Sequence, residues 1–172
     1  MRRRFGHGNR GFTYLGLLFA VVLAGIALAL TAQVARTVNQ RAKEAQLLFA
    51  GGQIRNAIRR YYEESPGAPR NYPTRFEDLL SDPRYPNTRR HLRRLFPDPM
   101  TGRFDWAIER SADGGIAGVH STSLDRPLKI AGFGAGFDFD GAKKYSEWIF
   151  VYQAPAGSGD AVPTAAVQRA GR

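Results

Sequence analysis

The sequence has no cysteine and only three histidines, His7, His91 and His120, among its 172 residues. The lack of cysteine excludes a disulfide scaffold, a cysteine-ligated zinc site and a thiol nucleophile. The histidines lie far apart in three different contexts, so no metal site or catalytic triad can be built from them locally. Ser121 follows His120 on a predicted strand, where neighbouring side chains point to opposite faces. We therefore expect that the protein is not an enzyme and has no cofactor.

Acidic residues are also scarce, with 15 Asp and Glu against 25 Lys and Arg, a formal net charge of +10. The first acidic residue is Glu44, whereas four arginines occur before residue 11: Arg2, Arg3, Arg4 and Arg10. The length suits one modest domain with appendages and is too short for a large two-domain enzyme.

A run of 24 residues from Phe12 to Ala35 has no charge at all. As a helix it would be about 36 Å long, which is enough to cross a bilayer. The arginines before it predict a cytoplasmic N-terminus and export of the chain from Arg36 onward. A cleaved secretory signal, with a small-residue site at Ala27-Leu28-Ala29, is the alternative.

Helix-compatible residues continue after this run, so we predict one long helix with a transmembrane half, 12–35, and an amphipathic half, 36–64. Ser65-Pro66-Gly67 would end it. The charged residues, including Arg41, Lys43 and Glu44, are assigned to the outer faces. Apolar residues at spacings of three and four predict a stripe that packs on a partner or a small sheet: Val34, Val38, Ala42, Ala45, Leu47, Leu48, Ile54, Ile58 and Tyr61 or Tyr62.

The head, residues 65–153, is predicted to be a small α+β unit. A short helix is expected near residue 77, because Thr74 and Glu77 have the spacing of a capping box. One or two helical turns are expected within 89–96, ended by Pro97. Residues 154–172 are rich in Ala, Gly, Ser and Pro and predict a disordered tail.

Three segments of the head have strand-like patterns: 103–110, 115–122 and 147–152. Phe104, Trp106 and Ile108 alternate with polar residues, and Asp113-Gly114 is a hairpin signal. The fold class is therefore α+β, a long helix packed on a three-stranded antiparallel sheet. The connection 123–146 is expected to be a flexible, glycine-rich loop.

A basic leader that ends in Gly11, followed by Phe12-Thr13 and a long apolar helix, resembles type IV pilins and type II secretion pseudopilins. The resemblance implies a pilin-like fold, cleavage after Gly11 by a prepilin peptidase, and N-methylation of Phe12. It also implies that the chain assembles through its N-terminal helix with other pseudopilins or pilins on an inner-membrane platform. The head would then lie in the periplasm.

The fifth residue of the mature chain differs from the family pattern, because Gly16 stands where a glutamate is usual. That glutamate is thought to pair with the N-terminal amine of a neighbouring subunit. Its absence favours a minor or atypical subunit over a major, polymer-forming one.

The head resembles the major-pseudopilin branch in the order of its motifs: Tyr72-Pro73-Thr74, Asp78-Leu79-Leu80, Pro97-Asp98-Pro99 and Phe104-Asp105-Trp106. The function that this implies is a structural subunit for protein secretion across the outer membrane. That branch holds calcium in a loop near the position of Asp138 and Asp140. Two carboxylates beside Gly141 could supply hard oxygen ligands. However, Lys143 and Lys144 would oppose a cation, so a solvated turn is preferred.

A basic cluster lies in the middle of the head and contains Arg84, Arg89, Arg90, Arg93 and Arg94, with Tyr85, His91 and Phe96 between them. Such a cluster could bind phosphates and stack bases, as in a minor pilin that binds nucleic acid. A solvated face, or one that pairs with acidic groups of a neighbouring subunit, is preferred. Nucleic acid is therefore not the expected partner.

Overall fold

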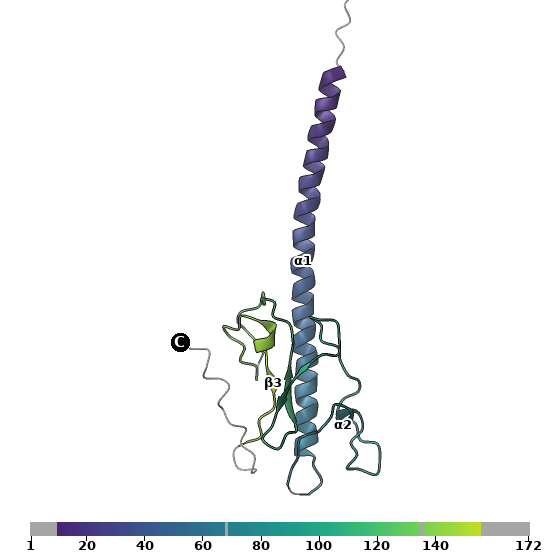
Figure 1. Cartoon of the computed structure of the whole chain (residues 1–172), viewed down its shortest axis with the longest axis vertical. Coiled ribbons are helices and arrows are strands. Elements are labelled where there is room, and N and C mark those ends of the chain that lie inside the picture. The colour runs from purple at the N-terminus through teal and green to yellow at the C-terminus, as the bar shows by residue number, and fades with distance from the viewer. Residues whose placement is uncertain (1–9, 68, 135, 156–172) are drawn as a thin grey trace, which may run out of the picture. The chain divides into compact units, whose positions relative to one another are not determined.

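The structure is a computed structural model that describes residues 10–67, 69–134 and 136–155; the side chains of residues 10–13 and 29–32 are not described. It divides into two compact units, residues 1–40 and 41–172. Residues 1–9 of the predicted leader and 156–172 of the predicted tail lie outside the described part. The elements, shown in Figure 1, are α1 (Arg10–Glu63), α2 (Glu77–Leu80), β1 (Ala107–Arg110), β2 (Ile116–His120), the 3₁₀ turn η1 (Tyr145–Glu147) and β3 (Phe150–Val151).

The long helix is confirmed, and α1 begins at Arg10 and ends at Glu63. In the first unit, every side chain from Tyr14 to Leu28 is exposed. The helix α1 is long and apolar enough to cross a membrane, and none of its most apolar 18-residue window is buried in the structure. Water is a poor solvent for such a surface, which therefore suits lipid or neighbouring apolar helices.

In the second unit, the end of α1 forms one wall of the hydrophobic core. Leu47, Ile54, Ile58 and Tyr62 are buried against Ile116, Val119, Trp148 and Phe150 from the sheet side of the head. The predicted stripe is therefore correct from Leu47 onward. Ala42 and Ala45 are exposed, so they do not pack on the sheet, and their burial against a partner is not tested. Val34 and Val38, in the first unit, are 65% and 59% exposed, so burial of these two against a partner is not tested.

The sheet has the order β1-β2-β3 with both pairs antiparallel, so the α+β class is confirmed. The strands are shorter than predicted. In β1 the predicted inward face is also wrong, because Phe104 lies outside the strand at 70% exposure and Ile108 is 37% exposed. Trp106 donates from Nε1 to the carbonyl of Phe96 at 2.8 Å, which ties the start of the strand to the preceding loop.

Two predictions for the segment before the sheet are wrong. The capping box does not form; instead, Asp78 Oδ2 accepts hydrogen bonds from Thr74 Oγ1 at 2.9 Å and from the Thr74 and Arg75 amides. Aspartate replaces the expected glutamate because α2 begins only at Glu77, which puts Asp78 within reach of residues 74 and 75. Residues 89–96 contain no helix, because the amides of His91 and Leu92 both donate to the carbonyl of Leu79.

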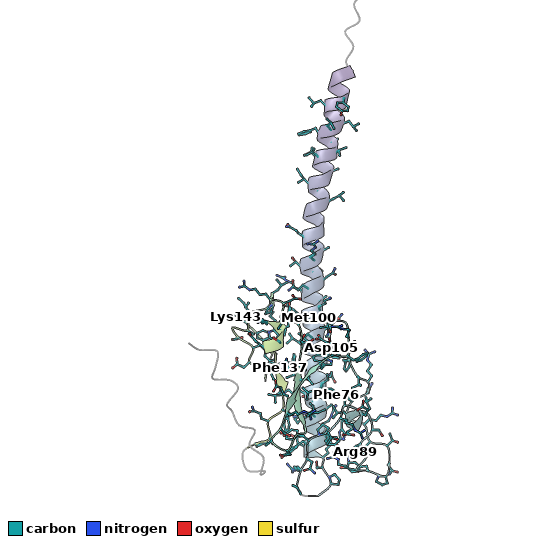
Figure 2. All side chains as sticks on the ribbon, in the orientation of Figure 1. Phe76, Arg89, Met100, Asp105, Phe137 and Lys143 are labelled. Atoms are coloured by element: carbon teal, nitrogen blue, oxygen red, sulfur yellow. The ribbon has the colours of Figure 1, made fainter. Side chains whose placement is uncertain are left out.

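The glycine-rich connection, predicted to be flexible, contributes aromatic side chains to the packing. Phe139 is 5% exposed and stacks on Trp148 with ring centroids 5.6 Å apart. Phe137, labelled in Figure 2, meets Phe150 edge to face at 5.4 Å. These contacts bury apolar area although the segment has no regular secondary structure.

Candidate functional site

The residues predicted for processing and assembly lie at the beginning of α1. Gly11 and Phe12 are within the helix, and their side chains are not described. Gly16 is exposed, and a Cβ built on it would have no neighbour within 4 Å. A larger side chain at residue 16 would therefore fit sterically, and the choice of glycine is not explained by packing within this chain.

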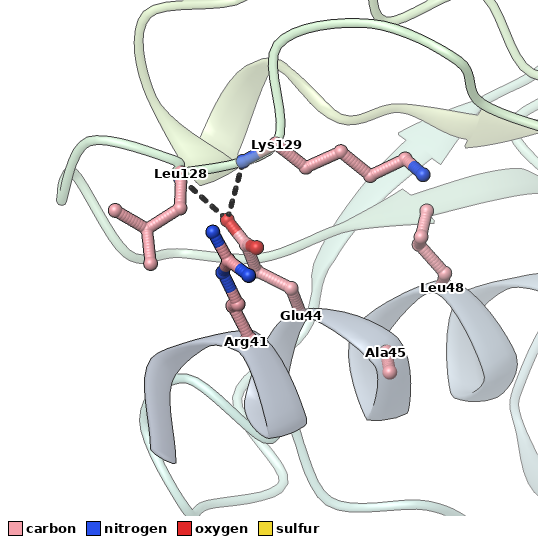
Figure 3. Close-up of a pocket in the computed structure, with 6 residues that line it drawn as sticks. All are labelled: Arg41, Glu44, Ala45, Leu48, Leu128 and Lys129. Atoms are coloured by element: carbon pink, nitrogen blue, oxygen red, sulfur yellow. Dashed lines mark hydrogen bonds between the residues drawn. The ribbon is translucent and has the colours of Figure 1, made fainter. Parts of the chain in front are cut away.

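One buried polar site of the second unit is centred on Glu44. Although it was assigned to an outer face of the helix, Glu44 is only 4% exposed. Its Oε1 accepts hydrogen bonds from the amides of Leu128 and Lys129 at 2.6 and 3.1 Å, drawn in Figure 3, and from the hydroxyl of Tyr145 at 3.0 Å. Burial of a carboxylate is costly unless it is hydrogen-bonded, and these three donors meet that requirement.

A shallow pocket of about 380 Å³ lies beside this carboxylate. Figure 3 shows its lining, which comes from one face of α1 and from the loop that Glu44 holds: Arg41, Glu44, Ala45, Leu48, Leu128 and Lys129. The apolar members and the two cations give the pocket an amphipathic character. Sequence reasoning missed it because the amides that bind Glu44 lie 84 and 85 residues away.

The predicted basic cluster is largely engaged within the head. Arg84 pairs with Asp82 at 2.7 Å, donates to Ser65 Oγ and to the carbonyl of Tyr61, and covers the Tyr61 ring at 3.5 Å. His91 is 3% exposed, and its Nε2 lies 3.0 Å from Asp82 Oδ2. These two side chains are therefore structural and are not presented to a ligand.

The same network holds the Asp82 carboxyl ionised. Burial alone would raise the pKa of Asp82, but hydrogen bonds from Arg84 and His91 outweigh burial and lower the pKa to about 2. Arg89 pairs with Glu64 at 2.5 Å. Arg90 and Arg93 are exposed and make no ion pair with any residue that the structure describes.

Asp138 and Asp140, the candidate calcium ligands, are both exposed and flank the buried Phe139. Gly141 has a φ of 80°, so the chain turns directly after them. Among the described residues, no third His, Cys, Asp or Glu joins them in a group that could hold a metal ion. Calcium usually takes six to eight oxygen ligands, so two carboxylates are a small part of such a site.

Ser121 and His120 have different partners, as their alternation on the strand predicts. Ser121 Oγ donates to the fully buried Asp98 at 2.7 Å, whereas His120 Nε2 lies 3.3 Å from Glu109 Oε1. Asp98 also accepts from the amide of Met100 at 2.9 Å, so its carboxylate fixes the turn after Pro97. Sequence reasoning treated Asp98 only as part of a motif and missed this anchoring role.

No protein-family model matches the chain, and no curated protein and no solved structure is significantly similar to it.

Proposed function

We propose that this protein is a membrane-anchored structural subunit, similar to the pseudopilins of type II secretion systems, that assembles through the beginning of α1. The observation that carries the proposal is that the two ends of α1 have different surroundings. Its first unit exposes apolar side chains from Tyr14 to Leu28, and its end forms the core of a small α+β head. An anchor and assembly element attached to a compact head is what such a subunit requires.

Small residues support close helix approach in the apolar part. Gly16 and Gly25 have no neighbouring atoms within 4 Å of a built Cβ, which leaves room for another backbone. In lipid, association of helices depends on close packing at small residues rather than on the hydrophobic effect. The proposed partners are therefore helices of other pseudopilins or pilins, brought together at an inner-membrane assembly platform.

The proposed topology has the N-terminus in the cytoplasm, a single span in the inner membrane and the head in the periplasm. It is supported by the arginines that precede the apolar run. The internal contacts of Arg84 and His91 favour this structural role over a nucleic-acid-binding minor pilin, because they remove two members of the basic cluster from the surface.

Mass spectrometry of the mature N-terminus tests the proposal. The full chain is expressed with and without a prepilin peptidase, and we expect a chain that begins at methylated Phe12 only when the peptidase is present. Gly11→Val should remain uncut, whereas Gly8→Val, three residues earlier, should be processed like the parent. A mature chain that begins near Leu30, or at Met1 in both strains, would refute the proposal.

A further inference from the structure

The segment of residues 124–130, here called the 124–130 segment, exposes large apolar side chains between basic ones. Leu124 is 68%, Leu128 42% and Ile130 66% exposed. Arg126 and Lys129 lie between them in sequence. Three such apolar side chains within seven residues, interleaved with cations, are typical of segments that lie at the surface of a membrane.

Hydrogen bonds to the rest of the head fix the backbone of this segment. Glu44 binds the amides of Leu128 and Lys129, and the hydroxyl of Tyr145, near the end of the 123–146 connection, binds the same carboxylate oxygen. The amide of Tyr145 in turn donates to the carbonyl of Asp125 at 3.1 Å. The exposed apolar side chains are therefore presented from a fixed backbone, which lowers the conformational entropy lost when they bind.

The pocket beside the segment has the chemistry of an amphipathic anion site. Ala45, Leu48 and Leu128 supply apolar surface, while Arg41 and Lys129 supply positive charge. Neither cation belongs to an ion pair within the part of the chain that the structure describes; Lys129 Nζ instead lies 5.4 Å from the centre of the Phe133 ring. Glu44 also lines the pocket, but its oxygen is bound by three neutral donors and forms no ion pair with either cation among the described residues, so the lining has two cations against one carboxylate.

We infer that the 124–130 segment and this pocket bind the surface of the membrane, with the headgroup phosphate of an anionic phospholipid between Arg41 and Lys129. Connectivity favours a lipid surface over a protein partner. Arg41 is six residues after Ala35, the end of the apolar run, so in any conformation the two lie within about 22 Å. The inference rests on the membrane anchoring proposed above.

The absence of cysteine allows a single-site fluorescence test on the full chain. A Leu124→Cys variant with an environment-sensitive dye is reconstituted into vesicles of phosphatidylcholine, alone or with phosphatidylglycerol. We expect a blue shift and quenching by brominated lipid that are larger when phosphatidylglycerol is present. Dye at Asp113→Cys is the control, because this hairpin turn lies near the C-terminal end of α1. The neighbouring Gly115 packs on Tyr72, and Tyr72 packs on Tyr62 at that end of the helix.

Charge variants of the labelled chain test the phosphate contact. Replacing Arg41 or Lys129 by glutamine should weaken the phosphatidylglycerol-dependent contact about fivefold for each cation removed. Arg93→Gln, at an exposed arginine of the basic cluster, should leave the contact unchanged. Equal signals in both vesicle types, or charge variants that leave the contact unaffected, would each overturn the inference.

Flotation of the same samples with the vesicles measures membrane anchoring separately from the headgroup site. A chain that floats with vesicles but shows no lipid contact at residue 124 would overturn only the headgroup site. A chain that does not float with either vesicle type would overturn both the site and the membrane anchor.

Discussion

The hydroxyl of Tyr145 donates to Oε1 of Glu44 across 101 residues of sequence, at 3.0 Å. This bond joins the helix α1 to the short turn η1, which leads into the last strand of the sheet. The two backbone amides that bind the same oxygen extend the connection to the 124–130 segment. One buried carboxylate therefore fixes the position of a long irregular connection against the helix.

Replacement of Glu44 by alanine should destabilise the head markedly. The variant leaves two amides and a buried hydroxyl without their acceptor, and we expect a loss of about 2–4 kcal/mol in the free energy of unfolding. Glu44→Gln retains an acceptor oxygen and should lose about half as much. Denaturant unfolding in detergent, followed by the fluorescence of Trp106 and Trp148, measures both, with the exposed Gln46→Ala as control. Equal stability of Glu44→Ala and Gln46→Ala would contradict the anchoring role.

The ring of Phe150 packs on Gly51 so closely that a side chain there is excluded. A Cβ at Gly51 would lie 2.5 Å from Cε2 of Phe150, whereas a Cβ at the neighbouring Gly52 would lie 3.3 Å from Cζ of Phe137. Two adjacent glycines have low helix propensity and weaken α1 at this point. Glycine is nevertheless required at residue 51, because the Phe150 side chain of β3 leaves no room for a Cβ there.

Gly51→Ala should therefore destabilise the head by about 1–3 kcal/mol, because overpacking outweighs the gain in helix propensity. Gly52→Ala should be nearly neutral, since a small movement of the Phe137 ring makes room. Thermal unfolding of the two variants beside the parent checks the difference. A more stable Gly51→Ala chain would show that Phe150 moves freely and that the close approach is unimportant.

The sequence was sufficient for the helix because its signals are local. The uncharged run, the continued helix-compatible residues and the break at Pro66 predicted an end at Glu64, one residue beyond the observed end. The three strand segments and the antiparallel pairing of β1 with β2 through a hairpin were also predicted. The inward face of β1 was not predicted correctly. The hydrogen bond from Trp106 to the Phe96 carbonyl ties down the residue just before the strand, and the alternation of residues within 103–110 gives no sign of this contact.

The residues that organise the candidate site could not be predicted in the same way. Glu44 has the sequence surroundings of an ordinary surface charge, with Arg41 and Lys43 beside it, and its donors are 84 to 101 residues away. Asp98 is similar, since its partner Ser121 lies 23 residues later. Nothing in the sequence around either acidic residue indicates its distant partners, so the role of each becomes specific only in three dimensions.

Acid should destabilise the head through Asp82. Its pKa is about 2 in the folded protein against an ordinary value of 3.8, so the folded state binds fewer protons than the unfolded state between these values. The stabilisation is complete above about pH 4 and is lost as the pH falls toward 2, an expected loss of about 2 kcal/mol. Asp82→Asn should be less stable at pH 7 and should lose less of its remaining stability on acidification.

Unfolding curves at a series of pH values between neutrality and pH 2 provide this measurement. Asp113→Asn, at the exposed hairpin turn, is the matched control and should keep the pH dependence of the parent. If Asp82→Asn and the parent have parallel curves, the Arg84–Asp82–His91 network does not couple protonation to folding.

Calcium should have no effect on the stability of the head. Asp138 and Asp140 are exposed, and no third acidic or histidine side chain in the described part of the chain joins them. Added at about 5 mM, above the dissociation constants of weak extracellular calcium sites, the ion should leave the melting temperature unchanged. An increase that Asp138→Asn and Asp140→Asn abolish would instead establish a calcium site in this loop.

Gly16 offers a direct test of assembly through the N-terminal helix. Its surroundings are open, so Gly16→Glu introduces a carboxylate without a clash inside the chain. A charge in lipid is costly unless it is paired, and in the proposed pilin-like assembly the amine of a neighbouring subunit would be the partner. When the variant is expressed with an assembly system and a prepilin peptidase, its recovery in sheared fibres should exceed that of Gly16→Gln, which has the same shape without the charge. Equal recovery of the two variants would mean that amine pairing has no part in the incorporation of this subunit, and that contacts of the apolar helix surface alone determine it.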